Sequence, residues 1–405
     1  MEFVISISPL LRRNFSQRQS NQTLLNFLWS VLTSTRFVII WYRITPTIAI
    51  SHPLEFSFQV VYLFMQKPIV TALLAYGMSG KLFHGPFVHA HTGFDFKGVL
   101  EHNTKKVKAD YPDVKSYDTL QEILDDPEIE LVIVNTPSNT HVDYSRKALL
   151  AGKDILVEKP FAPTVEEARE IFDLGRKLGR KVMVYQNRRF SSDFAVTKDT
   201  INSGKLGDII EIHLRYDRYR AEIGPKVFKE TPLPAAGIVY DLAAHLLDQT
   251  ICILGKPTGF RKITGVFRKN SQVEDYGHIH LKYPNQVNVF ITTSLLVADP
   301  LPGIIINGTK GSFVKAFCDN QEDQLIAGMK PGETGFGEEE AGKEGRLTLI
   351  SDQGVKTVEL VPSIKGKYMD IFEAVVQTIR NGKEFPVKEF EILAQIEILE
   401  SKAAF

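Results

Sequence analysis

From about residue 67 to residue 189, short continuous apolar segments, which are typical of buried strands, alternate with amphipathic segments. Residues 131–134, "LVIV", form a continuous apolar segment that is typical of a parallel strand covered on both faces. Thr164 and Glu167 form a capping-box pattern at the start of a helical stretch. The pattern predicts strands at 69–77, 96–103, 131–137, 154–160 and 181–187, and helices at 81–91, 119–126, 141–152 and 164–179. This alternation predicts an α/β fold with a doubly wound parallel sheet.

The pattern changes after residue 189. Residues 208–220 and 286–297 alternate between apolar and polar positions, as in an antiparallel sheet with one covered face. Residues 328–345 are rich in glycine and acids and predict a long exposed loop. Residues 368–382 predict an amphipathic helix that ends at Gly382. We therefore expect two domains, 65–189 and 190–405, and an α+β fold for the second.

Residues 1–64 differ from the rest of the chain, because they contain five arginines, only two acids, and neither lysine nor glycine. Arg36 and Arg43 interrupt the apolar residues, which disfavours a membrane span. The apolar run lies too far from the N-terminus for a secretory signal. Two interpretations stay open: a mitochondrial presequence, or upstream residues outside a folded protein that starts at Met65. We leave this extension out of the fold prediction.

Composition and charge narrow the classes of function. The 405 residues favour more than one domain. A formal net charge of zero provides no broad field that attracts nucleic acid or an anionic membrane, so we expect neither as a partner. Cys252 and Cys318 lie in no metal-binding or disulfide pattern, and His89 and His91 would not share a helix face. We expect no metal and a cytoplasmic protein, or a mitochondrial one if residues 1–64 are a presequence.

The stretch "AYGMSG", residues 75–80, separates the first expected strand from the first expected helix. It is a GxGxxG pattern with Ala75 in place of the first glycine. Gly77 would let the backbone approach a pyrophosphate, and Gly80 would let helix and strand pack closely. Its position favours a dinucleotide site, and a simple tight turn is the alternative.

The second expected strand ends in residues that give conflicting indications about the cofactor. An acid at this place favours the free ribose hydroxyl of NAD, and a basic residue favours the 2′-phosphate of NADP. Glu101 therefore supports NAD, whereas His102, Lys105 and Lys106 support NADP. Both cofactors stay open.

Two groups of residues suit proton transfer. Ligands of an open parallel sheet lie at the carboxyl ends of its strands, and Lys159 follows the strand "DILVE" there. A lysine at that place can polarise a substrate oxygen, although a surface Glu–Lys pair is the ordinary alternative. Asp241 and His245 are four residues apart and share one face of a helix. Histidine titrates near neutral pH, as a proton shuttle requires, and a surface Asp–His pair is the alternative.

The motifs "AYGMSGKLFHGPF", "NTPSNTH", "EKPFAPTVEEA", "YQNRRF" and "YDLAAHLLDQ" together resemble the Gfo/Idh/MocA (glucose–fructose oxidoreductase/inositol dehydrogenase) family. The resemblance begins near Met65, reaches the C-terminus, and is greatest for the NADP-dependent scyllo-inositol dehydrogenase branch. It implies a Rossmann domain followed by a domain for substrate binding and oligomerisation, with a large and mostly antiparallel sheet. It also implies NAD or NADP as cofactor and a homo-oligomer, a dimer or a tetramer.

The resemblance also assigns roles to single residues. Lys159 is expected to contact nicotinamide ribose and substrate, with a Lys159–Pro160 bond that is often cis. Asp241 is expected to fix the substrate, and His245 to act as the catalytic histidine. Apart from the resemblance, the polar side chains of Arg188 and Tyr219 are expected to hydrogen-bond substrate hydroxyls, with salt bridges at the domain junction as the alternative. Residues expected to bind the dinucleotide are Gly77, Met78, Ser79, Gly80, Glu101, His102, Thr136, Pro137, Asn139, His141, Glu158, Lys159 and Asn187.

The chain departs from the family pattern at Ala75, at the end of the second strand, where a Ser-Arg pair is missing, and in the N-terminal extension. Three functions remain: an NAD(P)-dependent oxidoreductase of an inositol-like polyol or sugar, a non-enzymatic dinucleotide sensor, or a reductase of another carbonyl such as a dicarbonyl or dihydrodiol. The combination of Lys159, Asp241 and His245 favours an enzyme, because a sensor needs no proton-transfer groups.

Overall fold

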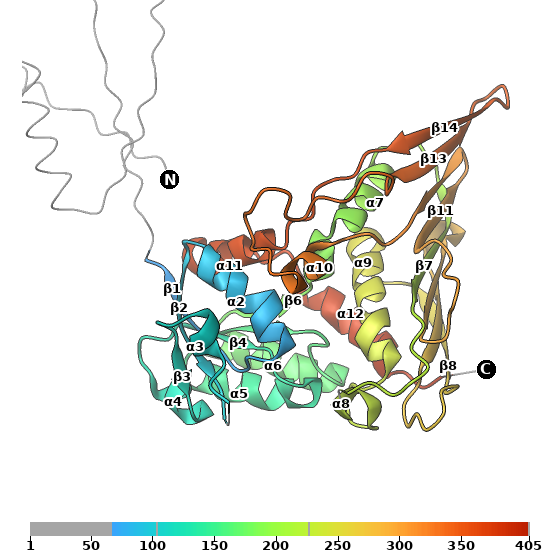
Figure 1. Cartoon of the computed structure of the whole chain (residues 1–405). Helices are drawn as coiled ribbons and strands as arrows, with labels where there is room; N and C mark the ends of the chain where they lie inside the picture. The colour runs from blue at the N-terminus through green and yellow to red at the C-terminus, as the bar shows by residue number, and fades with distance from the viewer. Residues whose placement is uncertain (1–66, 103, 226, 404–405) are drawn as a thin grey trace, which may run out of the picture. The chain divides into compact units, whose positions relative to one another are not determined.

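The computed structural model describes residues 67–102, 104–225 and 227–403. The predictions for residues 1–64 and for Asn103 lie outside the described residues. The described part contains a six-stranded and an eight-stranded sheet with helices packed against both (Figure 1). The predicted α/β class is confirmed.

The smaller sheet is parallel throughout and has the strand order β3-β2-β1-β4-β5-β6. Its strands are β1 (Ile69–Leu73), β2 (Phe94–Leu100), β3 (Lys115–Tyr117), β4 (Leu131–Val134), β5 (Asp154–Glu158) and β6 (Val182–Tyr185). Every residue of β1 and β4 is buried, as the continuous apolar runs predict. The strand order reverses between β1 and β4, which is where a doubly wound sheet binds its ligand.

The helices around this sheet are α2 (Gly85–Ala90), α3 (Val107–Asp110), α4 (Leu120–Asp125), α5 (His141–Leu150) and α6 (Val165–Leu178). Thr164 caps α6, because its side chain accepts the backbone N–H of Glu167 at 3.2 Å. The predicted helix 81–91 has two parts: a π-helical segment, η2 (Ser79–His84), and α2. Pro86 lies in the first turn of α2, where no backbone donor is required.

The larger sheet has the order β14-β13-β12-β11-β7-β10-β9-β8. Its strands are β7 (Ile209–Asp217), β8 (Gly259–Gly265), β9 (Tyr276–Lys282), β10 (Asn288–Ser294), β11 (Ile304–Gly308), β12 (Gly311–Lys315), β13 (Gly345–Ile350) and β14 (Lys356–Val361). All neighbours are antiparallel except β7 and β10, which are parallel. The predicted mostly antiparallel sheet is confirmed, although the two segments that led to it form the parallel pair. Alternation reveals one covered face, and it does not reveal the direction of the neighbouring strand.

One face of the larger sheet is covered by α7 (Ser192–Asn202), α9 (Ala244–Leu254) and α12 (Glu389–Glu400) (Figure 1). The connection from β12 to β13 contains α10 (Gln321–Ile326) and the predicted exposed loop 328–345. That prediction is wrong for part of the loop. Phe336 is buried against Phe87, with ring centroids 6.2 Å apart, and Glu339 forms a buried ion pair with Lys315 at 2.9 Å. The composition of a loop does not reveal which single residues in it, such as Phe336 and Glu339, are buried.

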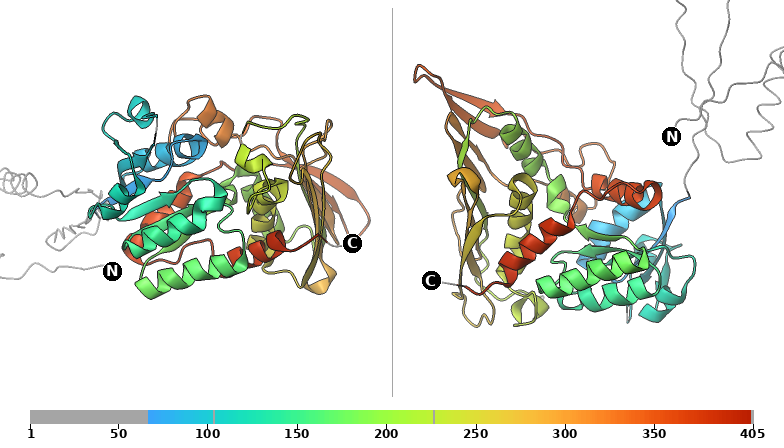
Figure 2. Two further views of the ribbon diagram at one scale, coloured as in Figure 1. Left: turned by 90° about the horizontal axis from the view of Figure 1, so that it is seen from below. Right: turned by 180° about the vertical axis from the view of Figure 1, so that it is seen from behind.

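The last two helices contribute to both hydrophobic cores. Helix α11 (Met369–Asn381) ends before Gly382, which has the predicted left-handed conformation. Its Phe372 stacks on Phe87 in the core of the smaller sheet, with ring centroids 5.2 Å apart. Helix α12 packs against α6 and α9, and Figure 2 shows it in red beside the green α6. A domain boundary at residue 189 stays a prediction, because the chain returns to the first core after forming the second.

Candidate active site

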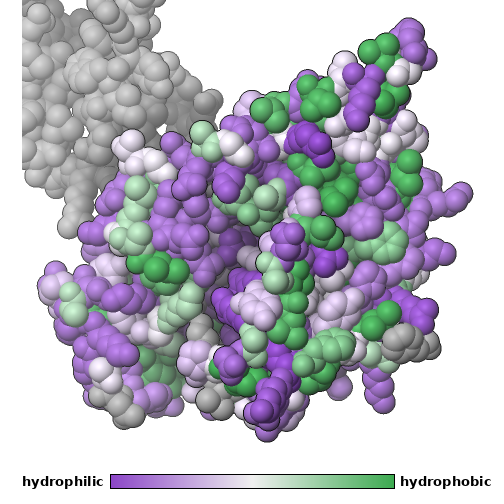
Figure 3. Space-filling model, turned by 45° about the vertical axis from the view of Figure 1, so that its right-hand side comes forward, coloured by the Kyte–Doolittle hydropathy of each residue, from purple (hydrophilic) through white to green (hydrophobic). Residues whose placement is uncertain are grey.

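A pocket of about 310 Å³ lies at the carboxyl ends of β1, β2 and β4. Figure 3 shows a hollow on one face of the molecule with hydrophilic residues around it. Predicted dinucleotide residues that line the pocket are Gly77, Glu101, His102, Thr136 and Pro137, and its other lining residues include Tyr76, Thr104, Lys106, Thr140 and Tyr144. The pocket therefore coincides with the place where the strand order reverses.

The turn between β1 and η2 has the features that a bound pyrophosphate requires. A Cβ at Gly80 would lie 2.1 Å from the Ala75 carbonyl oxygen, so only glycine permits this packing. A Cβ at Gly77 would meet no atom of the described chain within 4 Å, so the space above this residue is open to a ligand. Asn135, which was not predicted, accepts from the Ala75 N–H at 3.0 Å and donates to its carbonyl at 2.9 Å. These residues fit a dinucleotide.

The Glu101 carboxylate accepts hydrogen bonds from groups of the chain itself. It accepts the backbone N–H of Lys106 at 2.8 Å and of Val107 at 3.3 Å, and the Ser116 hydroxyl at 2.9 Å. Glu101 therefore holds the segment that leads into α3. His102 and Lys106 are exposed and line the pocket beside it.

The remaining predicted dinucleotide residues lie at different depths. Met78 is exposed beside the turn, and Asn139 is exposed in the short helix η3 (Ser138–Thr140). Asn187 is buried at the start of η4 (Asn187–Phe190). The buried His141 has ring nitrogens 2.8 Å from the Pro160 carbonyl and 2.9 Å from the Thr136 carbonyl. His141 therefore joins the ends of β4 and β5.

Glu158 forms a buried polar cluster beneath Lys159. Its carboxylate accepts from Ser79 Oγ at 2.8 Å, contacts His84 Nε2 at 2.9 Å, and accepts the Lys159 N–H at 3.1 Å. Burial alone would raise the pKa of Glu158, but contacts with His84 and Ser79 and the Lys159 charge lower it overall. An ionised Glu158 thus links the phosphate-binding turn to the backbone of Lys159. Neither this contact nor His84 as its partner was predicted.

Lys159 and Asp241 meet directly. Lys159 Nζ donates to the Asp241 backbone carbonyl at 2.7 Å and to its carboxylate at 3.2 Å. The Lys159–Pro160 peptide bond is cis, as the resemblance implies. Asp241 lies in the π-helical segment η5 (Val239–Ala243), and His245 lies in the first turn of α9. A single regular helix over both residues is therefore not observed, and π-helical turns of this kind often occur at functional sites.

Burial and neighbouring charges shift the pKa values of all three groups. Burial lowers the pKa of Lys159, and the Asp241 charge opposes this. The pKa of Asp241 is lowered, because the lysine charges outweigh the effect of burial. Burial and the charges of Lys159 and Arg188 hold the pKa of His245 well below its usual range. These surroundings favour the neutral imidazole of His245, whereas the sequence prediction assumed the titration of an ordinary histidine.

A second lysine contacts the site. Lys229 Nζ, on α8 (Val227–Glu230), lies 2.6 Å from Asp241 Oδ1. The sequence did not indicate this contact, because α8 is one helical turn without a periodic pattern. A lysine twelve residues before the aspartate gives no signal of proximity when an irregular connection lies between them.

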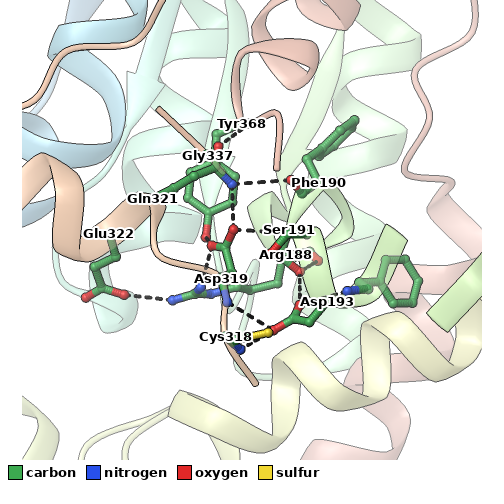
Figure 4. A network of polar contacts seen from close by, with 12 residues as sticks. Arg188, Phe190, Ser191, Asp193, Cys318, Asp319, Gln321, Glu322, Gly337 and Tyr368 are labelled. Carbon is green, nitrogen blue, oxygen red and sulfur yellow. Dashed lines mark hydrogen bonds and ion pairs between the residues drawn. The ribbon is translucent and has the colours of Figure 1, made fainter. Parts of the chain in front are cut away.

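Arg188 and Tyr219, the two other expected substrate contacts, lie in different surroundings. Arg188 contacts Asp319 at 3.1 Å and Glu322 at 2.7 Å, and Figure 4 shows its guanidinium between these carboxylates. Tyr219 is 64% exposed, and its backbone pairs with Leu296. The contacts of Arg188 are those of the salt-bridge alternative.

Within residues 67–102, 104–225 and 227–403, no group of three or more His, Cys, Asp or Glu side chains could hold a metal ion. In the same described part, no helix is both long enough and apolar enough to span a membrane.

Comparison with known proteins places the chain in one family. Residues 69–186 match the Gfo/Idh/MocA model described as "Oxidoreductase family, NAD-binding Rossmann fold", and residues 198–402 match its "C-terminal alpha/beta domain". An uncharacterized oxidoreductase of Schizosaccharomyces pombe, C115.03, is 37% identical over 82% of this chain and 96% of its own length. The scyllo-inositol 2-dehydrogenase (NADP(+)) IolW of Bacillus subtilis is 35% identical over 82% of this chain and 92% of its own length.

A solved structure supports the same assignment. The Bacillus subtilis protein YvaA superposes with a TM-score of 0.78 at 34% identity, over 82% of this chain and 94% of its own. Both halves of the described fold are thus shared with relatives named as oxidoreductases or dehydrogenases. From its two matched domains and these relatives, the chain belongs to the Gfo/Idh/MocA family of oxidoreductases and is a dehydrogenase with an NAD-binding Rossmann domain.

Proposed function

We propose that this dehydrogenase transfers a hydride between a nicotinamide dinucleotide and a secondary alcohol or ketone of an inositol-like polyol or a sugar. The observation that carries the proposal is the contact between Lys159 and Asp241, which lie at the end of β5 and in η5. This contact joins the dinucleotide-binding sheet to the second part of the fold at the carboxyl edge of the strands. The name of the relative IolW supports an inositol as the substrate class.

In the proposed mechanism, the chain supplies position, charge and proton transfer. A bound nicotinamide dinucleotide supplies the hydride acceptor. Neutral His245 can take the hydroxyl proton of the substrate, since burial and nearby cations keep its pKa well below the usual range. Lys159 polarises the substrate oxygen, and Asp241 fixes the substrate through a neighbouring hydroxyl. In the reverse direction His245 gives the proton to the oxygen of a ketone, and a bound reduced dinucleotide would supply the hydride.

NADP is the proposed preferred dinucleotide. Glu101, the only acid expected to select NAD, has its carboxylate engaged by Lys106, Val107 and Ser116. His102 and Lys106 line the pocket and can accommodate a 2′-phosphate. The comparison that tests this is kcat/KM with NADP against kcat/KM with NAD on one substrate, and a higher value with NAD would contradict it.

The test of the function is a cofactor-reduction assay at 340 nm on the 405-residue chain with inositols and aldoses. We expect turnover that falls about a hundredfold or more in K159M and H245N. Dinucleotide binding in H245N should stay within a few-fold of the wild type. K147M is the matched control, because Lys147 forms a surface pair with Asp143 at 2.7 Å and should leave turnover unchanged.

Two outcomes would contradict the proposal. Near-full activity in K159M or H245N would show that the substituted residue does not have the catalytic role assigned to it. Tight dinucleotide binding without turnover on any polyol would favour a sensor, or a reductase of a dicarbonyl or dihydrodiol.

We also propose a cytoplasmic homo-oligomer with a small-molecule substrate. Light scattering after size exclusion measures the oligomeric state, and fluorescence microscopy of a tagged full-length chain measures the compartment.

A further inference from the structure

Two lysines share one carboxylate oxygen in the candidate site. Lys229 Nζ donates to Asp241 Oδ1 at 2.6 Å, and Lys159 Nζ donates to the same oxygen at 3.2 Å. Because both bonds end on one oxygen, the ammonium groups are closer to each other than the sum of the two bond lengths. Like charges at this separation repel, so the Lys229 charge disfavours the protonated form of Lys159.

The chain fixes Lys229 through the next residue, Glu230. The Glu230 carboxylate accepts from Arg268 at 2.7 Å and from the Gly224 N–H at 3.1 Å. The Arg268 side chain is 2% exposed and also contacts Asp275 at 3.3 Å. A buried, charge-assisted anchor of this kind restricts α8, so Lys229 is directed toward Asp241.

We propose that Lys229 is a positioning residue of the active site, which holds the Asp241 carboxylate beside Lys159 and places a second positive charge next to the proton-accepting groups. This inference rests on the proposed function, because it assigns Lys229 to the same proton transfer. The charged or titratable groups that face this cluster are Asp241, His245, Glu158, His141 and Arg188.

These neighbours decide in which direction the Lys229 charge shifts the pKa values of Lys159 and His245. Burial is the largest cause that lowers the pKa of Lys159 and of His245, and the Lys229 charge lowers both further. Loss of that charge therefore raises both pKa values, whichever of the two groups takes the proton. A base with a raised pKa stays protonated to higher pH, so the acidic limb of the rate profile moves to higher pH.

A purely structural ion pair would behave differently. The side chains of Lys229 and Asp241 are 37% and 28% exposed, and pairs at such exposure contribute little to the free energy of unfolding. Their loss would change stability slightly and leave the pH profile in place. The pH profile therefore distinguishes the two roles.

The first experiment measures Lys159 directly on the full-length chain, without dinucleotide or substrate. Trace acetylation with acetic anhydride over a pH series, followed by mass spectrometry, gives the midpoint at which Lys159 becomes reactive. We expect this midpoint to rise by about one pH unit in K229M and to stay unchanged in K229R. K205M is the matched control, because Lys205 forms a similar pair with Glu359 at 2.6 Å on the larger sheet.

The second experiment measures turnover. In K229M the acidic limb of the pH profile of kcat/KM should move to higher pH by about one unit. At pH values below this limb, kcat/KM should therefore fall roughly tenfold. K229R should keep the wild-type profile. An unchanged Lys159 midpoint in K229M, or a shift in K229R equal to that in K229M, would overturn the proposal. K229Q removes the same charge if K229M does not fold. A wild-type chain without turnover would count against the proposed function alone, since acetylation still decides the role of Lys229.

Discussion

At the scale of single residues, the two glycines after β1 are needed for different physical reasons. Gly80 is needed for packing, because a Cβ there would lie 2.1 Å from a backbone oxygen that cannot move aside. The packing of the described chain does not require Gly77, because a Cβ there meets nothing within 4 Å, so the proposed approach of a pyrophosphate is the role that a glycine serves at this position. The same substitution at the two positions should therefore separate folding from dinucleotide binding.

We predict that G80A lowers the free energy of unfolding by about 1–3 kcal/mol, since the turn must shift to relieve the overlap. G77A should change that free energy by less than about 0.5 kcal/mol and still weaken dinucleotide binding at least tenfold. Urea unfolding and calorimetric titration with NADPH measure the two quantities. Unchanged dinucleotide affinity in G77A would show that no phosphate approaches this backbone.

At the scale of elements, Arg188 connects η4 to α10 in the β12–β13 connection. It contacts Asp319, whose side chain is 1% exposed, and Glu322, and Asp319 in turn accepts from the Tyr368 hydroxyl at 2.6 Å. Loss of the guanidinium would leave Asp319 as a buried charge without its main counterion. The position of α10 beside η2 would then lose a major restraint.

We predict that R188Q lowers the free energy of unfolding by about 3 kcal/mol, because a buried carboxylate loses its partner. R188Q/D319N should recover part of this loss, since the amide does not need a cation. Chemical denaturation measures both variants. A wild-type unfolding curve for R188Q together with a raised KM would instead support the substrate contact that the sequence predicts for Arg188.

The sequence predicts regular elements better than the contacts between them. The apolar runs of β1 and β4 and the cap of α6 follow local rules, and these elements form as expected. The resemblance placed Lys159 and Asp241 separately at the substrate, and their direct contact was not predicted, because 82 residues separate the two. Lys229 and the π-helical segments were not predicted, since neither irregular connections nor the π-helical turn has a distinct hydrophobic period.

At the scale of the whole molecule, α12 joins the two cores. Its residues Ile392 and Ile396 are buried in the core of the smaller sheet, and Ile398 and Leu399 are buried in the core of the larger one. A helix that is buried against two cores cannot leave one core without exposing its apolar residues to water at the other. The two sheets should therefore lose their structure together, although the chain is long enough for two independent units.

We predict that I396A and I398A each lower the free energy of unfolding by about 2–5 kcal/mol and that each destabilises both sheets. The two side chains are almost fully buried but lie in different cores, so they form a matched pair. Hydrogen exchange by mass spectrometry in urea measures peptides of β1–β6 and of β7–β14 separately. E397A is the control, because Glu397 forms only a surface pair with Lys256 and should change stability by less than about 0.5 kcal/mol. Unfolding midpoints that separate in I396A, with only the smaller sheet affected, would show that each sheet is stable without the other and that α12 is a removable contact between them.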